Sequence, residues 1–385
     1  KHLISMKKIL FRKLLSDYMS FFLIALLSAS IIMWVFQAVN FLDIMIEDGR
    51  DYFVYISYSL LNFPKIFSKL FPFVLFFSLF YVTIKYENNN ELIIFWNFGI
   101  NKIQLINFIF KFSLLLMLIQ IVLTSLIVPS TQDKARSFLR SSTINFLGSF
   151  IKPQRFNDTI KGVTIYTERK DEKGNLYNIY LKKEIDQNNI QVTYAKKGMI
   201  KETNNFPILI LFDGETITEK NNEITNFSFS KSDFLLKNFK TNTTTYIKTQ
   251  EISTINIFKC MYSLYYSKIN PNKNFNTTIE NCNMKNLKNI FKEIYKRIFI
   301  PLYIPILMLI PLLVTTSSKE NINYSKLKFM VFLLGLFFII FSETTIRLIS
   351  KVIYTNYFII SIPIIVLFIL YLSFYRKFNI KIMKD

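Results

Sequence analysis

Apolar and polar positions divide the chain into two sets of long apolar runs separated by one polar block, about Ser130–Tyr295. Each run approaches or exceeds the ~20 residues that cross about 30 Å of hydrocarbon as an α-helix. The pattern therefore predicts an α-helical membrane protein with six transmembrane helices, three on each side of the block. The runs are Met19–Asn40, Phe63–Ile84, Ile103–Val128, Ile298–Thr315, Phe329–Leu348 and Tyr357–Tyr375.

Inside the polar block the apolar residues recur at every second position, which is typical of β-strands. The expected strands are Gly162–Glu168, Leu176–Leu181, Ile190–Tyr194, Pro207–Phe212, Thr216–Thr218 and Ile224–Ser230. Turns are expected between them at Lys173-Gly174-Asn175, Asp213-Gly214 and Asn221-Asn222. Short strands at this spacing predict an all-β sandwich or jelly roll inserted between the third and fourth membrane helices.

These elements divide the chain into four parts. Residues 1–129 form the first membrane half, with a cytoplasmic loop at 85–102, and residues 297–385 form the second membrane half. Residues 130–255 form the β-jelly-roll domain. The composition of residues 256–296 turns helical, so this segment is expected to connect the β domain to the fourth membrane helix.

Basic residues flank the first and last apolar runs and determine the expected orientation. By the positive-inside rule both termini are expected in the cytoplasm, which agrees with an even number of crossings. The polar block is then predicted to lie in the periplasm or outside the cell. The basic residues are Lys7, Lys8, Arg12 and Lys13 before the first run, and Arg376, Lys377, Lys381 and Lys384 after the last.

Composition excludes several kinds of chemistry. The formal net charge is +21, but the basic residues are scattered over loops on both sides, so nucleic acid is not an expected partner. The single histidine is His2, and no metal site is expected. The sequence has neither a phosphate-binding glycine loop nor a Gly-x-Ser-x-Gly elbow. We therefore predict no catalytic residue and no cofactor bound by this chain.

The two cysteines, Cys260 and Cys282, both lie in the polar block. They can form a disulfide if the block lies outside the cytoplasm, where disulfides persist. Their spacing alone does not establish the bond.

The cytoplasmic loop between the second and third membrane helices contains a short amphipathic segment, Glu91–Asn101. Gly99 is expected to end a helix there in a left-handed cap, and Asn101 to cap the start of the next helix. One interpretation is an interfacial connector anchored by Trp96. The other is a coupling helix that docks into another protein, which a long, structured loop between membrane helices favours.

Two pairs of basic residues lie near the outer ends of membrane helices, against the usual distribution of positive charge. Lys65 and Lys69 are four residues apart in the second helix, and Arg347 and Lys351 are four apart at the end of the fifth. One interpretation is that these side chains snorkel and that Glu343 forms an ion pair with Arg347. The other is a cationic rim that binds an anionic lipid headgroup or phosphate.

The start of the fourth membrane helix combines charge with proline. Glu293 and Arg297 are four residues apart, which is the spacing of an ion pair on one helix face. Pro301 and Pro305 follow inside the same helix, so unpaired carbonyl groups and a bend are expected.

Two of these segments resemble the LptF/LptG permease family, also called YjgP/YjgQ. Asn90–Asn101 is similar to the family's cytoplasmic helix with its "Glu-Leu/Met…Gly-Ile/Val-Ser" pattern. Glu293–Tyr303 is similar to the family's "Glu-Leu-His-Arg-Arg-Phe…Pro-Leu" pattern at the start of helix four. Phe156–Glu168 resembles the start of the family's jelly roll, more that of LptF than that of LptG. The resemblance extends over nearly the whole chain, including the order of helices and β domain.

The resemblance implies a permease subunit of an ABC transporter in the bacterial inner membrane. Such a subunit extracts lipopolysaccharide and passes it through its periplasmic jelly roll to a periplasmic bridge. The implied partners are an LptG-like second permease, two copies of an LptB-like ATPase that uses the ATP, and LptC/LptA-like jelly-roll proteins. Glu293 and Arg297 match the helix-four motif. The residues implied to couple to the ATPase are Glu91, Leu92, Phe95, Trp96 and Gly99.

The chain departs from the family pattern in two places. Phe95, Trp96 and Asn97 stand where the family often has an arginine and small residues. The outer end of the first helix has Gln37, Asn40 and Asp43 and lacks the cationic residues that meet lipid phosphates in some members. The residues expected to supply this charge instead, and so to bind the lipid headgroup, are Lys65, Lys69, Arg347 and Lys351.

On this hypothesis the acyl chains of the lipid enter an apolar jelly-roll interior lined by Val163, Ile165, Leu209 and Leu211. An alternative is a membrane-anchored periplasmic binding or assembly protein without transport activity, which composition and topology permit equally. Such a protein would not need the coupling loop. A periplasmic enzyme with a membrane anchor is a third hypothesis and would need clustered polar residues in the β domain.

Overall fold

The computed structural model describes residues 2–46, 52–141, 151, 153–160, 162–171, 174–186, 189–202, 207–220, 223–235, 247–269, 279, 281–351 and 353–382. The chain forms two compact units. One unit comprises Lys1–Val35, Asn62–Asp133 and Ile247–Asp385, and it contains most of the membrane helices. The other comprises Phe36–Leu61 and Lys134–Tyr246, and it contains the β-sheet.

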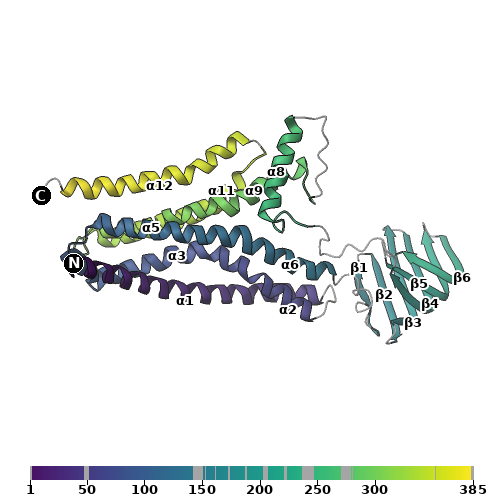
Figure 1. Cartoon of the computed structure of the whole chain (residues 1–385). Helices are drawn as coiled ribbons and strands as arrows, with labels where there is room; N and C mark the ends of the chain where they lie inside the picture. Colours follow the sequence, from purple (N-terminus) through teal and green to yellow (C-terminus); the bar gives the residue numbers. More distant parts are fainter. Residues whose placement is uncertain are drawn as a thin grey trace. The chain divides into compact units, whose positions relative to one another are not determined.

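The N-terminal helices account for three apolar segments long enough to cross a membrane, Met6–Leu42, Tyr52–Asn88 and Lys102–Leu139. Each contains one of the three predicted runs. The elements are α1 (His2–Ile46), α2 (Tyr52–Leu61), α3 (Phe63–Asn88), α4 (Glu91–Asn97), α5 (Lys102–Val122), the π-helical turn η1 (Leu123–Ile127) and α6 (Val128–Ser141) (Figure 1).

The C-terminal helices supply three more such segments, Met284–Thr316, Tyr324–Leu348 and Tyr354–Phe378. The predicted arrangement of six membrane helices, three before and three after a β domain, is confirmed. The elements are α8 (Thr254–Ile269), η2 (Met284–Asn286), α9 (Leu287–Ile294), η3 (Tyr295–Phe299), η4 (Ile300–Leu302), α10 (Tyr303–Leu309), η5 (Ile310–Thr316), α11 (Tyr324–Leu348) and α12 (Ile353–Ile382).

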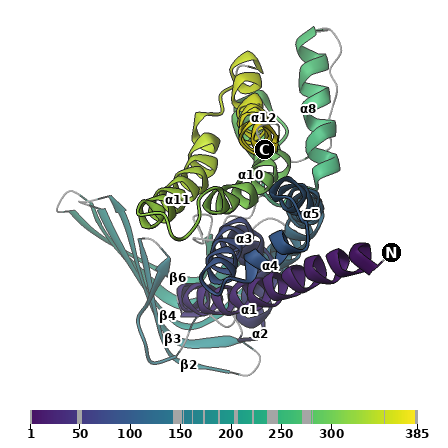
Figure 2. The ribbon, with the colours of Figure 1, turned by 90° about the vertical axis from the view of Figure 1, so that its left-hand side faces the viewer.

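The fourth membrane segment is irregular and is enclosed by the others. A π-helical turn (η3) and a 3-10 turn (η4) precede α10, and a second 3-10 stretch (η5) follows it. Pro301 and Pro311 lie in the two 3-10 stretches. Proline removes a backbone donor, which explains why a continuous α-helix is disfavoured at these positions. In this segment 78% of the most apolar window is buried, compared with 17% in the first. Figure 2 shows α10 among α3, α5, α11 and α12.

Two apolar cores hold these helices together. One joins side chains from α1, α3, α4, α5 and α10, and the other joins α3, α10, η5 and α11. The second core contains a close helix approach, because a methyl group added to Gly335 of α11 would lie 2.0 Å from Cζ of Phe76 in α3. A larger side chain therefore cannot occupy position 335 unless the ring moves.

The β domain is one antiparallel sheet in which the strands follow one another in chain order, β1 to β6 (Figure 1). The predicted all-β domain between the third and fourth membrane helices is confirmed. The strands are β1 (Asn157–Ile160), β2 (Val163–Lys170), β3 (Asn175–Asp186), β4 (Asn189–Glu202), β5 (Pro207–Lys220) and β6 (Glu223–Leu235).

The predicted turn at Asp213-Gly214 is wrong, because both residues lie inside β5. Gly214 pairs with Ala195 of β4 and with Phe229 of β6, while Asp213 interrupts the pairing on both sides. Asp213 has a φ of +51°, a left-handed conformation that aspartate tolerates better than most residues. The segments predicted as two strands are therefore one strand with a local bend. The predicted turn at Asn221-Asn222 lies outside the described residues, as does Lys173 of the predicted hairpin.

Strand β3, on the other side of β4, has a similar bend, because Asn178 has a φ of +49°. The register places Asn178 and Asp213 in one row across the sheet, on either side of Lys196. Side chains normally alternate between faces, but Leu176 and Ile179 both join the same apolar core. The left-handed backbone at Asn178 and Asp213 therefore shifts the alternation of side chains by one position. The same face of the sheet stays apolar on both sides of the bend.

Candidate functional site

The predicted cytoplasmic helix is present as α4, and its end has the geometry of a Schellman cap. The amide of Ile100 donates to the carbonyl of Phe95 (3.0 Å), and the amide of Gly99 donates to the carbonyl of Trp96 (2.9 Å). Gly99 has a φ of +70°, so it takes the left-handed conformation that such a cap requires. The predicted glycine cap is confirmed. Asn101 stands at the start of α5, but its side chain accepts no capping hydrogen bond.

The two faces of α4 differ. Leu92 and Phe95 are 3% and 2% exposed and belong to the core formed with α1, α3 and α5. Ile93 and Ile94 are 49% and 45% exposed. Leu92 and Phe95 therefore hold α4 on the bundle, whereas the two isoleucines form its accessible apolar surface. Glu91 is half-buried and accepts a hydrogen bond from Asn89 Nδ2 at 3.1 Å.

Two lysines connect the loop around α4 to helices that are distant in the sequence, through hydrogen bonds to backbone carbonyls. Lys7 Nζ in α1 donates to the carbonyl of Gly99 at 2.7 Å. Lys102 Nζ at the start of α5 donates to the carbonyl of Thr315 in η5 at 2.6 Å, and it lies 5.5 Å from the centre of the Trp96 ring. Sequence reasoning used Lys7 only for topology and missed Lys102, because the acceptors are backbone carbonyls that leave no trace in the sequence. The end of α4 is thus connected to α1 and to the fourth membrane segment.

Arg297, in the π-helical turn η3, is buried and bound on several sides. Its Nε donates to Glu293 Oε1 at 3.1 Å, so the predicted ion pair is present. Nη1 donates to the carbonyl of Ile252 and to Thr254 Oγ1, both at 2.9 Å, and Nη2 donates to the carbonyl of Gln250 at 3.0 Å. The guanidinium therefore joins the segment before α8 to the start of the fourth membrane segment. We call this set of contacts the Arg297 clamp.

The clamp extends to the third membrane segment. Thr124 Oγ1, in the π-helical turn η1, donates to the carbonyl of Arg297 at 2.7 Å, and Thr254 Oγ1 donates to the carbonyl of Ser125. A π-helical turn leaves carbonyl groups without their usual helical partner, and here the threonines satisfy two of them. The sequence predicted Glu293 and Arg297 but gave no signal for Thr124 or Thr254.

Cys260 and Cys282 form a disulfide with a Cα–Cα distance of 5.7 Å. The bond joins the middle of α8 to the residues just before η2. It lies in a small apolar cluster with Ile257 and Ile290. The sequence left this pairing open, and the structure forms it.

The four basic residues near the outer helix ends fall into two separate pairs. Lys65 is half-buried and donates to Gln132 Oε1 at 3.4 Å, while Lys69 is exposed. Arg347 and Lys351 are exposed at the junction of α11 and α12. Among the described residues no hydrogen bond or ion pair joins the two pairs. The Glu343–Arg347 ion pair, which was one of the two interpretations, does not form.

In the β domain, the predicted lining residues lie together. Val163, Ile165, Leu209 and Leu211 belong to one apolar cluster, each 9% exposed or less. They therefore share one face of the sheet. Their side chains pack against one another, so a lipid chain would have to separate them to enter.

Six apolar helices divided by an inserted antiparallel β domain define a multi-pass membrane protein. Residues 12–377 match the family described as "Lipopolysaccharide export system permease LptF/LptG", and the chain belongs to this family. The match does not distinguish LptF from LptG. This family is an inner-membrane permease family and not a class of catalytic enzymes.

The chain is also similar to a protein of Rickettsia prowazekii (strain Madrid E) described as "Uncharacterized protein RP871". The two are 24% identical over 233 residues, which is 60% of this chain and 64% of the relative. The match thus spans less than two thirds of that relative.

Proposed function

We propose that this chain is a permease subunit of an ATP-driven exporter that extracts lipopolysaccharide from the inner membrane. It then passes the lipid through its β domain to a periplasmic bridge. The observation that carries the proposal, beside the family, is α4. This short helix is fixed by a glycine cap and by buried Leu92 and Phe95, and it presents Ile93 and Ile94 outward. A rigid helix with an exposed apolar face is the type of element that inserts into a groove of a partner.

The partner at α4 is an ATPase, since this chain has no phosphate-binding loop of its own. Movement of α4 would reach α1 through the Lys7–Gly99 hydrogen bond and the fourth membrane segment through the Lys102–Thr315 hydrogen bond. Two ATPase copies would act on this chain and on a second permease subunit. ATP is then a cofactor of the partner and not of this chain.

The β domain and the disulfide would lie in the periplasm, with both termini in the cytoplasm. The basic residues around the first and last helices support this orientation. The disulfide supports it independently, because such bonds persist in oxidising compartments and are rare in the cytosol.

The periplasmic bridge would consist of jelly-roll proteins that add strands to the sheet. Among the described strands the edges are β1, with 4 residues, and β6, with 13. A long edge offers more backbone donors and acceptors for strand addition. Ile224 and Phe227 on β6 are 72% and 69% exposed, which favours β6 as the edge that receives the partner.

Lipid would approach between the membrane helices with its phosphates near exposed basic side chains. Lys69, Arg347 and Lys351 are exposed and lack an ion-pair partner among the described residues, which supports this role. The acyl chains would then meet the apolar face of the sheet that contains Ile165 and Leu211.

A membrane-anchored binding protein without transport activity is the second candidate. Such a protein could bind its partner at the exposed β6 edge. It would not account for the fixed position and exposed apolar face of α4. Whether the chain associates with an ATPase therefore distinguishes the two candidate functions.

We expect the wild-type chain to co-purify with an ATPase and a second permease in a mild detergent. Replacing both exposed isoleucines, Ile93→Asp with Ile94→Asp, should reduce the recovered ATPase about tenfold or more, because the apolar contact is lost. Gly99→Pro should have the same effect, since proline cannot adopt a φ near +70° or donate to Trp96. Glu91→Ala tests the half-buried carboxylate in the same assay.

The matched control is Ile255→Asp in α8, a similarly exposed isoleucine (65%) away from α4. It should leave the ATPase bound, and protease protection should show all variants inserted. If the wild-type chain retains no ATPase in detergent or in native lipid discs, the transport proposal fails at its first step.

A further inference from the structure

A row of aromatic side chains crosses the sheet on the face opposite its apolar core. Tyr166 pairs with Tyr180, and Tyr180 pairs with Tyr194, so three neighbouring strands each contribute one tyrosine. The adjacent residues Ile165, Ile179, Leu181 and Ala195 belong to the core on the other face, which places the tyrosines outside it. Phe156, which precedes β1, extends the row with its ring centre 5.0 Å from that of Tyr166.

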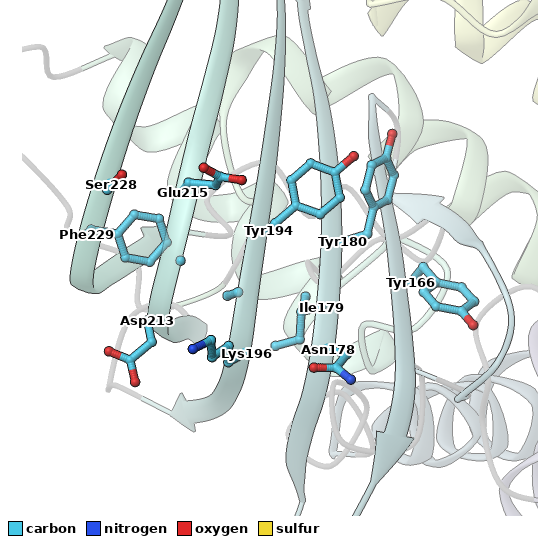
Figure 3. Close-up of a pocket in the computed structure, with 12 residues that line it drawn as sticks. Tyr166, Asn178, Ile179, Tyr180, Tyr194, Lys196, Asp213, Glu215, Ser228 and Phe229 are labelled. Atoms are coloured by element: carbon cyan, nitrogen blue, oxygen red, sulfur yellow. The ribbon is translucent and has the colours of Figure 1, made fainter.

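These rings lie in a groove with a volume of about 670 Å³. Figure 3 shows Tyr180, Tyr194 and Glu215 side by side on β3, β4 and β5. Below this row, Asn178, Lys196 and Asp213 occupy the row in which the sheet bends. The bend thus brings a line of amide, ammonium and carboxylate groups next to a line of aromatic rings.

Several features of the row exceed what sheet stability requires. Cross-strand aromatic pairs do stabilise sheets, and the ring centres of Tyr180 and Tyr194 lie 5.3 Å apart. Yet Tyr194 is 45% and Phe156 is 67% exposed, so large apolar surfaces remain in water. Lys196, Asp213 and Glu215 are also exposed and have no ion-pair or hydrogen-bond partner for their side chains among the described residues. Aromatic faces with a few convergent polar groups are typical of a ligand site.

We propose that this groove binds the saccharide part of the exported glycolipid. The proposal rests on the proposed function, which brings a lipopolysaccharide to this domain. The C–H groups on one face of a pyranose ring carry partial positive charge and complement the negative face of an aromatic ring. The sugar hydroxyl groups would bond to Asn178, Lys196, Asp213 and Glu215. Strands are about 4.8 Å apart, so the row from Tyr166 to Glu215 extends about 14 Å and can hold more than one sugar ring.

Other ligands fit the groove less well. The polar side chains of the groove, two of which are the carboxylates of Asp213 and Glu215, would be desolvated by an acyl chain, at a large cost in free energy. Asp213 and Glu215 would repel phosphate groups, and Lys196 is the single basic side chain that lines the groove within the described residues. The two faces of the sheet would then divide the ligand, with the lipid chains on one and the sugars on the other.

The test uses the full chain in lipid nanodiscs without sugar-headed detergent, because such a detergent would compete for the site. The probe is the lipid-free core oligosaccharide released from lipopolysaccharide by mild acid, and titration calorimetry measures its dissociation constant. Tyr180→Leu and Tyr194→Leu should each weaken binding about tenfold, since they remove the ring but keep an apolar side chain. Tyr194→Phe should retain binding, because the ring remains.

Tyr262→Leu is the matched control, since Tyr262 is 69% exposed but lies in α8. It should leave binding unchanged. Equal affinities of wild type and both leucine variants would overturn the proposal, as would the absence of oligosaccharide binding to the wild type. Intact lipopolysaccharide is titrated in parallel. If it binds and the oligosaccharide does not, the groove assignment alone fails. If neither binds, the proposed function fails with it.

Discussion

Replacing Arg297 by methionine is expected to destabilise the chain by about 3–5 kcal/mol, the usual effect of removing one partner from a buried ion pair. Arg297 is 2% exposed, and its guanidinium donates to Glu293, Thr254 and two backbone carbonyls. Methionine fills a similar volume but offers no donor. All four acceptors would lose this donor, and Glu293 would keep a half-buried charge without its partner, which adds to the loss.

Thermal unfolding of the purified chain in one detergent measures this effect. Arg297→Lys should be intermediate, because an ammonium group keeps the charge next to Glu293 but cannot reproduce the fixed fork of donors. Arg347→Met is the matched control, since Arg347 is exposed at the end of α11 and should change stability by less than about 0.5 kcal/mol. If Arg297→Met and Arg347→Met unfold at the same temperature, the Arg297 clamp does not stabilise the helix junction.

Gly335→Leu is expected to disrupt the contact between α3 and α11. A methyl group at this position would already lie 2.0 Å from Phe76 Cζ, and Phe76 is fully buried. The larger side chain forces either the ring or the helix to move, with an expected loss of about 1–3 kcal/mol or more. The measurement is again the unfolding temperature in detergent.

A second substitution distinguishes this steric effect from other causes. Phe76→Ala alone should destabilise by about 3–5 kcal/mol through the cavity that it leaves. Combined with Gly335→Leu it should be less destabilising than the sum of the two, because leucine fills space that the ring has left. Additive losses would show that Gly335 and Phe76 do not meet as described.

The membrane fold could be predicted from the sequence because each helix needs a long apolar run and little else. The glycine cap at Gly99 could be predicted for the same kind of reason, since one residue determines the local backbone. Asp213-Gly214 was misread as a turn because its composition is that of a turn. Phe212 and Gly214 pair with β4 and β6 and keep the strand continuous there, so tertiary contacts override the local preference.

The candidate sites were less predictable because they depend on partners distant in sequence. The spacing of Glu293 and Arg297 gave the ion pair, but the carbonyls of Gln250 and Ile252 have no side-chain signal. The same holds for Lys102, which donates to a carbonyl more than two hundred residues later in the chain. The tyrosine row becomes visible only when the register of β2, β3 and β4 is known.

The central claim is that ATP hydrolysis in a partner moves lipopolysaccharide through this chain by way of α4. The most direct test is release of lipopolysaccharide from proteoliposomes that contain this chain, a second permease and the ATPase, measured on a soluble periplasmic acceptor. We predict release that requires ATP, that is lost with Ile93→Asp and Ile94→Asp together, and that persists with Ile255→Asp. If the assembled wild-type complex hydrolyses ATP yet releases no more lipopolysaccharide than without ATP, the transport account is wrong.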